Sequence, residues 1–193
     1  MHRGIIYVTA VMTCGIALGQ AESDSQLARR LADPATRSDA VSRVLREGAD
    51  RIPLLLSWAK RPPEQVNEYE LDIGLADVFG QLKAREAIPF LIKNINLSRT
   101  NKANTWLKTA EIVEREMPAV AALVRIGLPA SRAIMRAFET EAPMSPVERL
   151  PLIFVVSRIK DPEARGFLSS VCGQANLERY WAEDGLKNIP EKP

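Results

Sequence analysis

The clearest pattern in the chain is a set of apolar and small residues that recurs in three segments. Residues 74–95, 118–139 and 151–172 align without gaps, at offsets of 44 and then 33 residues. Within each segment the apolar positions follow spacings of three, four and seven residues, which places them on one face of a helix. The matched rows are Leu75, Ala119 and Leu152; Val78, Ala122 and Val155; Phe79, Leu123 and Val156; Leu82, Ile126 and Ile159; Ala87, Ser131 and Ala164; Phe90, Ile134 and Phe167; and Leu91, Met135 and Leu168.

The helical phase breaks once in the middle of every segment, at residues 83–86, 127–130 and 160–163. Gly127 is typical of a helix C-terminus, and Pro129 suits the start of the next helix. Asp161 is placed to cap a helix that begins with Pro162 and has Glu163 in its first turn. Each segment is therefore predicted to be two helices joined by a turn. Such hairpins bury their apolar faces by stacking on one another, which requires three or more of them.

The proline positions indicate where the first helix of each hairpin begins. Pro118 and Pro151 fall at the same place in their segments, eight residues before Ile126 and Ile159. The upstream sequence still has a helical pattern, and residues 145–148 read Ser-Pro-Val-Glu, a capping box with proline in its first turn. We therefore expect the first helices to start before the proline and to kink there.

The pattern also extends beyond the three segments. A weaker copy precedes them, in which Val41, Val44 and Leu45 share one helix face. We further expect a short helix at residues 23–31, a last amphipathic helix at 177–189 and a disordered tail at 190–193.

The N-terminal 21 residues differ from the rest of the chain. Residues 1–3 are short and positive, residues 5–18 are uncharged and mostly apolar or small, and residues 19–21 read Gly-Gln-Ala. This layout is typical of a secretory signal peptide, with cleavage predicted between Ala21 and Glu22. Two other interpretations place residues 4–21 in a short membrane anchor or attach a lipid at Cys14. A third makes this stretch an ordinary buried helix. The signal and anchor interpretations both export the remainder.

Composition supports helices and limits the possible partners. Hydrophobic residues make up 46% and charged residues 26%, as in soluble globular chains, while aromatics are only 6%. The formal net charge of +2 comes from interleaved signs without a basic run, which argues against nucleic-acid binding. Cleavage after Ala21 removes Arg3, and the net charge then falls to +1.

Cleavage also restricts the chemistry of the exported chain. It removes His2, the only histidine, and Cys14, which leaves Cys172 as the single cysteine. Histidine-based nucleophilic catalysis, His-ligated or multi-thiolate zinc and an intramolecular disulfide are then excluded. Acidic pairs occur, and each is expected on a solvated helix face: Glu68 and Glu70, Glu111 and Glu114, and Glu114 and Glu116. We therefore predict no catalytic residues, no cofactor and no metal site.

Cys172 aligns with Ile95 and Glu139 at the end of a second helix. We expect it to be a small buried or half-buried hydrophobe. The alternative is a thiol that forms an intermolecular disulfide or a thioether.

Two short motifs resemble elements of HEAT repeats. Residues 161–164 read Asp-Pro-Glu-Ala, like the turn of that consensus, and residues 87–91 read Ala-Ile-Pro-Phe-Leu, like the start of its second helix. The short copies are also similar to HEAT-like repeats of the phycobilisome-lyase type. The resemblance covers roughly residues 37–172, with variable copy lengths and no such turn at residues 127–130. It implies an all-α fold over residues 22–189, a short right-handed α-solenoid of about four HEAT-like helical hairpins. A generic α-helical bundle is the alternative.

The resemblance also suggests where a partner would bind. Second helices usually line the inner face of a HEAT array, and such concave faces bind partners. Two aligned rows lie four residues apart on that face: Ile88, Arg132 and Arg165, then Ile92, Arg136 and Ser169. We expect a shallow stripe with the three arginines clustered, suited to carboxylate or phosphate groups. The alternative is a face that only confers solubility.

The leading functional hypothesis is an exported, non-catalytic HEAT-like scaffold that binds another protein, periplasmic in a bacterial host or otherwise secreted. Under this hypothesis the protein binds no nucleic acid, and it contacts a membrane only if residues 4–21 are retained. Two alternatives stay open. One is a lyase or chaperone-like protein of the phycobilisome-lyase HEAT type, which would need a chromophore. The other is a nucleic-acid-binding HEAT-like array, which the low net charge and the predicted export oppose.

Overall fold

The computed structural model describes residues 23–100, 109–140, 145–173 and 177–189, and the regular structure in these ranges is entirely helical. The predicted all-α class is therefore confirmed for the described part of the chain. The predicted signal segment 1–21, its cleavage site between Ala21 and Glu22, and the tail 190–193 lie outside the described residues.

The helices follow the predicted segments closely. In chain order they are α1 (Asp24–Ala32), α2 (Arg37–Glu47), α3 (Ile52–Lys60), α4 (Glu68–Leu82), α5 (Ile88–Lys93), α6 (Ala110–Glu116), α7 (Pro118–Ile126), α8 (Leu128–Thr140), α9 (Pro146–Ile159), α10 (Arg165–Cys172) and α11 (Leu177–Asn188). Short 3₁₀ turns η1 (Gly48–Arg51), η2 (Arg85–Ala87) and η4 (Pro162–Ala164) precede α3, α5 and α10. Among the described helices, none alone has the length and apolar composition to cross a membrane, although α7 and α8, bent by 113°, meet that criterion as a pair.

The predicted helix ends are confirmed by their hydrogen bonds. Glu148 accepts the Ser145 amide at 3.0 Å within the capping box at the start of α9. Asp161 accepts the Glu163 amide at 3.0 Å, which caps the turn before α10. Gly127 ends α7 with a φ of 79°, a left-handed conformation that glycine adopts without strain.

Pro118 and Pro151 have different effects on the first helices of their hairpins. The helix α9 starts upstream, as expected, and continues through Pro151. In the preceding hairpin, α6 ends at Glu116 and α7 begins at Pro118, because Met117 between them is extended (φ −114°, ψ 91°). A residue that precedes proline is disfavoured in the α region. The expected single kinked helix is therefore two helices here.

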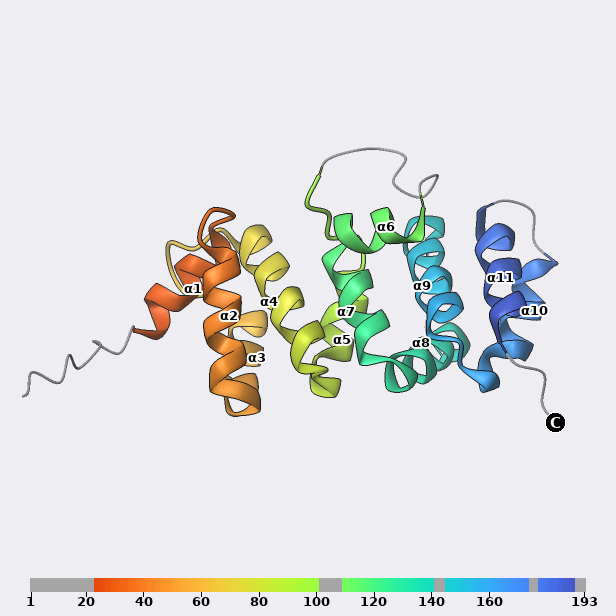
Figure 1. Ribbon diagram of the computed structural model, residues 1–193, viewed down its shortest axis with the longest axis horizontal. Coiled ribbons are helices and arrows are strands. Elements are labelled where there is room, and N and C mark those ends of the chain that lie inside the picture. Colours follow the sequence, from red (N-terminus) through yellow and green to blue (C-terminus); the bar gives the residue numbers. More distant parts are fainter. Residues whose placement is uncertain (1–22, 101–108, 141–144, 174–176, 190–193) are drawn as a thin grey trace, which may run out of the picture.

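The helical hairpins follow one another in chain order along the long axis of the molecule (Figure 1). The first helices of successive hairpins contact one another, with α4 against α7, α7 against α9, and α9 against α11. Each second helix also contacts the first helix that follows it in the chain, in the pairs α3–α4, α5–α7, α8–α9 and α10–α11. The last helix, α11, thus occupies the position of a further first helix.

The matched apolar rows of the first helices form the interior of this arrangement. Leu75, Ala119 and Leu152 are at most 1% exposed, and the rows of Val78 and Phe79 are fully buried. At the end of the first helices Ile126 is 7% exposed, while Leu82 and Ile159 are half-buried against the same core. Burial of each large aliphatic side chain contributes about 1.5–3 kcal/mol, so these rows are the main source of stability.

Candidate functional site

Two of the predicted arginines and one predicted isoleucine line the same open groove. Arg132 and Arg136 project from α8, and Ile88 lies at the start of α5. This α5–α8 groove has a volume of about 760 Å³. Its other lining residues are Arg85, Pro89, Ile126, Leu128, Pro129 and Ala133.

The α5–α8 groove combines positive charge with an apolar floor. Three guanidinium groups line it, from Arg85, Arg132 and Arg136, and its described lining includes no carboxylate. Ile88 and Ile126 are buried in the floor, whereas Leu128 is 44% exposed. The groove can therefore contact both carboxylates and aliphatic side chains.

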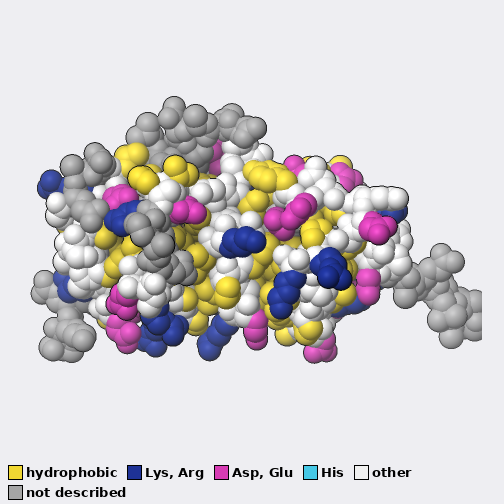
Figure 2. Space-filling view, turned by 180° about the vertical axis from the view of Figure 1, so that it is seen from behind, with side chains coloured by type: hydrophobic (Ala, Val, Ile, Leu, Met, Phe, Trp, Pro, Cys, Tyr) yellow, Lys and Arg dark blue, Asp and Glu magenta, His cyan; other side chains and the backbone are white. Residues whose placement is uncertain are grey.

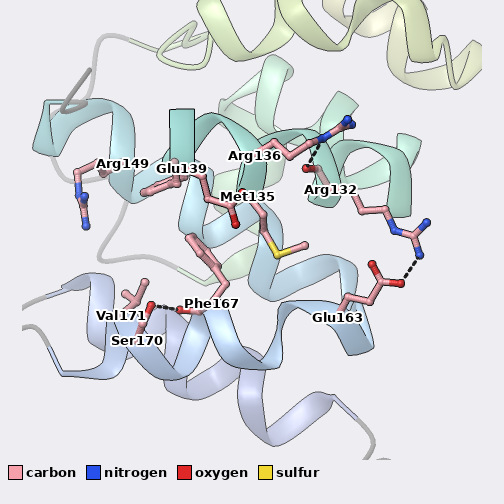
Figure 3. A pocket seen from close by; sticks show the side chains of 10 residues that line it. Arg132, Met135, Arg136, Glu139, Arg149, Glu163, Phe167, Ser170 and Val171 are labelled. Carbon is pink, nitrogen blue, oxygen red and sulfur yellow. Dashed lines mark hydrogen bonds and ion pairs between the residues drawn. The ribbon is translucent and has the colours of Figure 1, made fainter. Parts of the chain in front are cut away.

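A second groove lies on the other side of α8, between α8 and α10 (Figure 3). This α8–α10 groove has a volume of about 880 Å³, and Arg132 and Arg136 line it as well. The other lining residues are Met135, Phe138, Glu139, Arg149, Glu163, Phe167, Ser170 and Val171. The two grooves thus share two exposed arginines of α8.

The centre of the α8–α10 groove is apolar. The rings of Phe138 and Phe167 meet edge to face, with centroids 5.0 Å apart. Met135 and Phe167 point into the space between the two helices (Figure 3). Methionine is flexible and polarizable, so this centre can accommodate apolar side chains of different shapes.

Ion pairs fix the charged groups at both ends of this groove. Arg132 donates to Glu163 at 2.9 Å, and its Nε lies 3.9 Å from Oδ2 of Asp161. That Asp161 oxygen is buried and accepts no hydrogen bond from the described residues. The Asp161 carboxylate is therefore desolvated, and its negative charge attracts the Arg132 guanidinium. Arg136 donates to the carbonyl oxygen of Arg132 at 3.3 Å, and its guanidinium points away from Phe167 (Figure 3).

At the other end, Arg149 is held by two elements. It donates to both carboxylate oxygens of Glu178, at 3.3 and 3.2 Å, and its guanidinium carbon lies 5.3 Å from the centroid of the Phe138 ring. A fork-shaped pair and a cation–π contact both restrict the arginine rotamer. The groove therefore has a rigid cationic end beside its aromatic centre.

The remaining predicted stripe residues lie outside both grooves. Arg165 is half-buried and donates to the carbonyl oxygen of Ile189 at 2.9 Å, which ties α10 to the end of α11. Ile92 is half-buried against the core. Ser169 is exposed, and its neighbour Ser170 lines the α8–α10 groove instead. The structure thus brings together Ile88, Arg132 and Arg136 and does not place Arg165 with them.

Several groove residues had no clear signal in the sequence. Phe138 belongs to none of the matched rows, and Phe167 belongs to a row predicted to be in the core although it is only half-buried. Arg85 lies in a predicted turn, and Arg149 lies in the first helix α9. Their proximity depends on how α8 packs against α5 and α9 and on its position beside α10.

One expectation for the acidic residues is wrong. Glu116 is only 7% exposed, so it does not lie on a solvated face. Its backbone carbonyl accepts the Arg99 amide at 2.8 Å, because the chain after α5 packs back against the end of α6. Glu114 pairs with Arg158 of α9 at 3.0 Å.

Cys172 is half-buried, as expected. Burial, followed by the nearby Glu183 carboxylate, raises the pKa of its thiol, so it is protonated at neutral pH.

No family model matches the chain, and comparison with curated proteins and with solved structures gives no match. Figure 2, the view from behind, shows hydrophobic side chains on the surface among those of Lys, Arg, Asp and Glu. The two grooves are therefore the candidate functional site.

Proposed function

We propose that the protein is a non-catalytic, HEAT-like α-solenoid scaffold that binds a segment of another protein along its second helices. The segment carries acidic side chains next to apolar ones. Two features support the solenoid: the first helices contact one another in chain order, and each second helix contacts the first helix that follows it.

The observation that carries this proposal is the position of Arg132 and Arg136 between two grooves with apolar floors. A bound segment can place carboxylates at these guanidinium groups and apolar side chains beside Phe167 on one side and Leu128 on the other. Arginine, methionine and aromatic residues are enriched at protein interfaces. Carboxylate recognition by arginine forks adds orientation.

A non-catalytic role agrees with the side chains that line the grooves. The hydroxyl of Ser170 donates to the Phe167 carbonyl oxygen at 2.7 Å, and Glu163 is paired with Arg132. Both groups are engaged in contacts that shape the groove.

A peptide-display selection tests the proposal with a defined probe. We expect the protein to enrich peptides that combine Asp or Glu with a neighbouring large apolar residue. The double variant Arg132→Glu/Arg136→Glu is expected to lose this selection. The matched control Arg46→Glu/Lys60→Glu changes the net charge equally at two exposed positions outside the grooves and is expected to retain it.

Circular dichroism must show that both double variants are folded. Equal enrichment of the same peptides by the wild type and by Arg132→Glu/Arg136→Glu would contradict the proposal.

We also propose that the protein is exported, with residues 1–21 as the signal peptide. Mass spectrometry of the protein from its host measures the mature N-terminus, expected at Glu22. An intact N-terminus on protein recovered from the cytoplasm would refute export. Crosslinking of the same material then identifies the partner as the protein crosslinked to α5, α8 or α10. These crosslinks are expected to be lost in the variant Arg132→Glu/Arg136→Glu.

A further inference from the structure

A polar cavity unrelated to the two grooves lies among the first helices. Both α2 and α7 contact α4. Residues of these three helices, together with Pro34 and Arg99, line a cavity of about 390 Å³. Its charged lining groups are the guanidiniums of Arg37, Arg99 and Arg125 and the carboxylate of Asp77. The described lining therefore has an excess of positive charge.

Two of these arginines have fixed partners. Arg37 is 8% exposed, donates through Nε to the Leu31 carbonyl oxygen at 2.9 Å and forms an ion pair with Glu70. Arg99 forms an ion pair with Asp77 and donates through Nε to the Arg115 carbonyl oxygen at 3.2 Å. Both guanidiniums are held as walls of the cavity, and Asp77 is neutralised by Arg99.

The third guanidinium, that of Arg125 on α7, is exposed and makes no hydrogen bond or ion pair with any described residue. Facing the same cavity are the hydroxyls of Ser38 and Ser42, one turn apart on α2, and the amide of Gln81 on α4. None of these three side chains has a hydrogen-bond partner among the described residues. Hydrogen-bond donors from three helices, without partners among the described residues, thus line one positively charged cavity.

We propose that this cavity binds a small phosphate-type oxyanion, either inorganic phosphate or the phosphate group of a small molecule. Arg125 supplies a two-pronged guanidinium contact, and Ser38, Ser42 and Gln81 supply neutral donors. A carboxylate offers its lone pairs in one plane, whereas a tetrahedral oxyanion accepts hydrogen bonds from several directions, which suits donors from three helices. This site is separate from the proposed protein-binding grooves and does not depend on Arg132 or Arg136.

The test is a titration of the ¹⁵N-labelled protein with inorganic phosphate and with glycerol 3-phosphate, followed by amide chemical shifts. Sodium chloride keeps the ionic strength constant, because exposed charges respond to salt alone. We expect saturable shifts of amides in α2, α4 and α7. Arg125→Ala is expected to weaken binding about tenfold to a hundredfold, the range for loss of a charged hydrogen-bonded contact.

The variants separate the site from a general effect of charge. Arg46→Ala removes an exposed arginine of α2 that does not line the cavity, and it is expected to bind phosphate like the wild type. Ser42→Ala is expected to weaken binding without changing net charge. Tighter binding of glycerol 3-phosphate than of phosphate identifies a small-molecule ligand, and equal affinities identify free phosphate.

Two results would overturn the proposal. One is a linear, non-saturating response to both phosphates that chloride reproduces. The other is unchanged affinity in folded Arg125→Ala.

Discussion

Gly80 of α4 lies directly against Ala122 of α7. A Cβ atom on Gly80 would come within 2.7 Å of the Ala122 Cα and 2.9 Å of its Cβ, closer than non-bonded carbon atoms in proteins approach one another. Gly185 of α11 lies against Ser157 of α9 in the same way, with a Cβ 2.8 Å from the Ser157 Cα. Ser157 aligns with Gly80 in the repeat. Small residues therefore set the close approach of first helices at two interfaces.

The first prediction concerns this close approach. Gly80→Ala is expected to lower the free energy of unfolding by about 1–3 kcal/mol, because the added methyl group forces α4 and α7 apart. Gly166→Ala in α10 is the control, since its added Cβ meets nothing within 4 Å. That control is expected to raise stability by roughly 0.5–1 kcal/mol through reduced backbone entropy of the unfolded chain. Urea unfolding measures both, and similar changes in the two variants would contradict the close contact.

The second prediction concerns Arg37, which joins three helices. Its guanidinium contacts the Leu31 carbonyl at the end of α1 and both the carboxylate and the carbonyl oxygen of Glu70 on α4. Arg37→Met keeps the volume but leaves these acceptors unpaired, and we expect a loss of about 2–4 kcal/mol.

Arg179 of α11 provides the comparison for Arg37. It forms an exposed i,i+4 pair with Glu183, and Arg179→Ala is expected to leave the urea midpoint essentially unchanged. A midpoint shift in Arg37→Met as small as that in Arg179→Ala would show that the buried contacts do not stabilise the fold.

The third prediction concerns pH. Burial, followed by the neighbouring Glu68 carboxylate, raises the pKa of Asp72 on α4 to about 6, and Lys93 opposes this shift. The unfolded chain has the ordinary value of 3.8, so the ionised carboxylate destabilises the folded state above pH 6. This cost disappears as the pH falls from 6 through 3.8.

Asp72→Asn removes that charge at every pH. It is therefore expected to stabilise the protein at pH 7.5 by on the order of 1 kcal/mol, after allowance for solvent screening at this half-buried site. The gain should shrink towards zero at pH 3.5. Urea unfolding of both proteins across this range measures the difference, and a gain independent of pH would be inconsistent with the raised pKa.

The fourth prediction separates the two kinds of contact in the proposed binding face. With a peptide recovered from the selection, Arg132→Glu/Arg136→Glu is expected mainly to slow association, and the association rate of the wild type should fall as salt increases. Phe167→Ala removes the aromatic ring from the α8–α10 groove and is expected mainly to speed dissociation. Surface plasmon resonance at two salt concentrations measures both rates. If Phe167→Ala leaves the dissociation rate unchanged, the segment does not occupy that groove.

The sequence by itself determined most of the helices and the inward-facing rows of the first helices. Apolar positions at helical spacing identify a buried face whatever lies against it, and the Leu75, Val78 and Phe79 rows are buried as predicted. Caps and turns are equally local, so Ser145, Asp161 and Gly127 were predictable from their neighbours in sequence. The predicted stripe correctly singled out Arg132 and Arg136 as exposed neighbours on α8.

Only the tertiary structure decided which exposed residues share a groove. Arg165 aligns with Arg132, yet it turns to the Ile189 carbonyl, because α11 packs against α10 and offers that acceptor. Phe138 and Phe167 meet across two helices, and Arg125 and Ser42 line one cavity together with residues of α4. These pairings join residues tens of positions apart. They depend on helix crossing geometry and on close contacts such as Gly80 with Ala122, which helical periodicity does not encode.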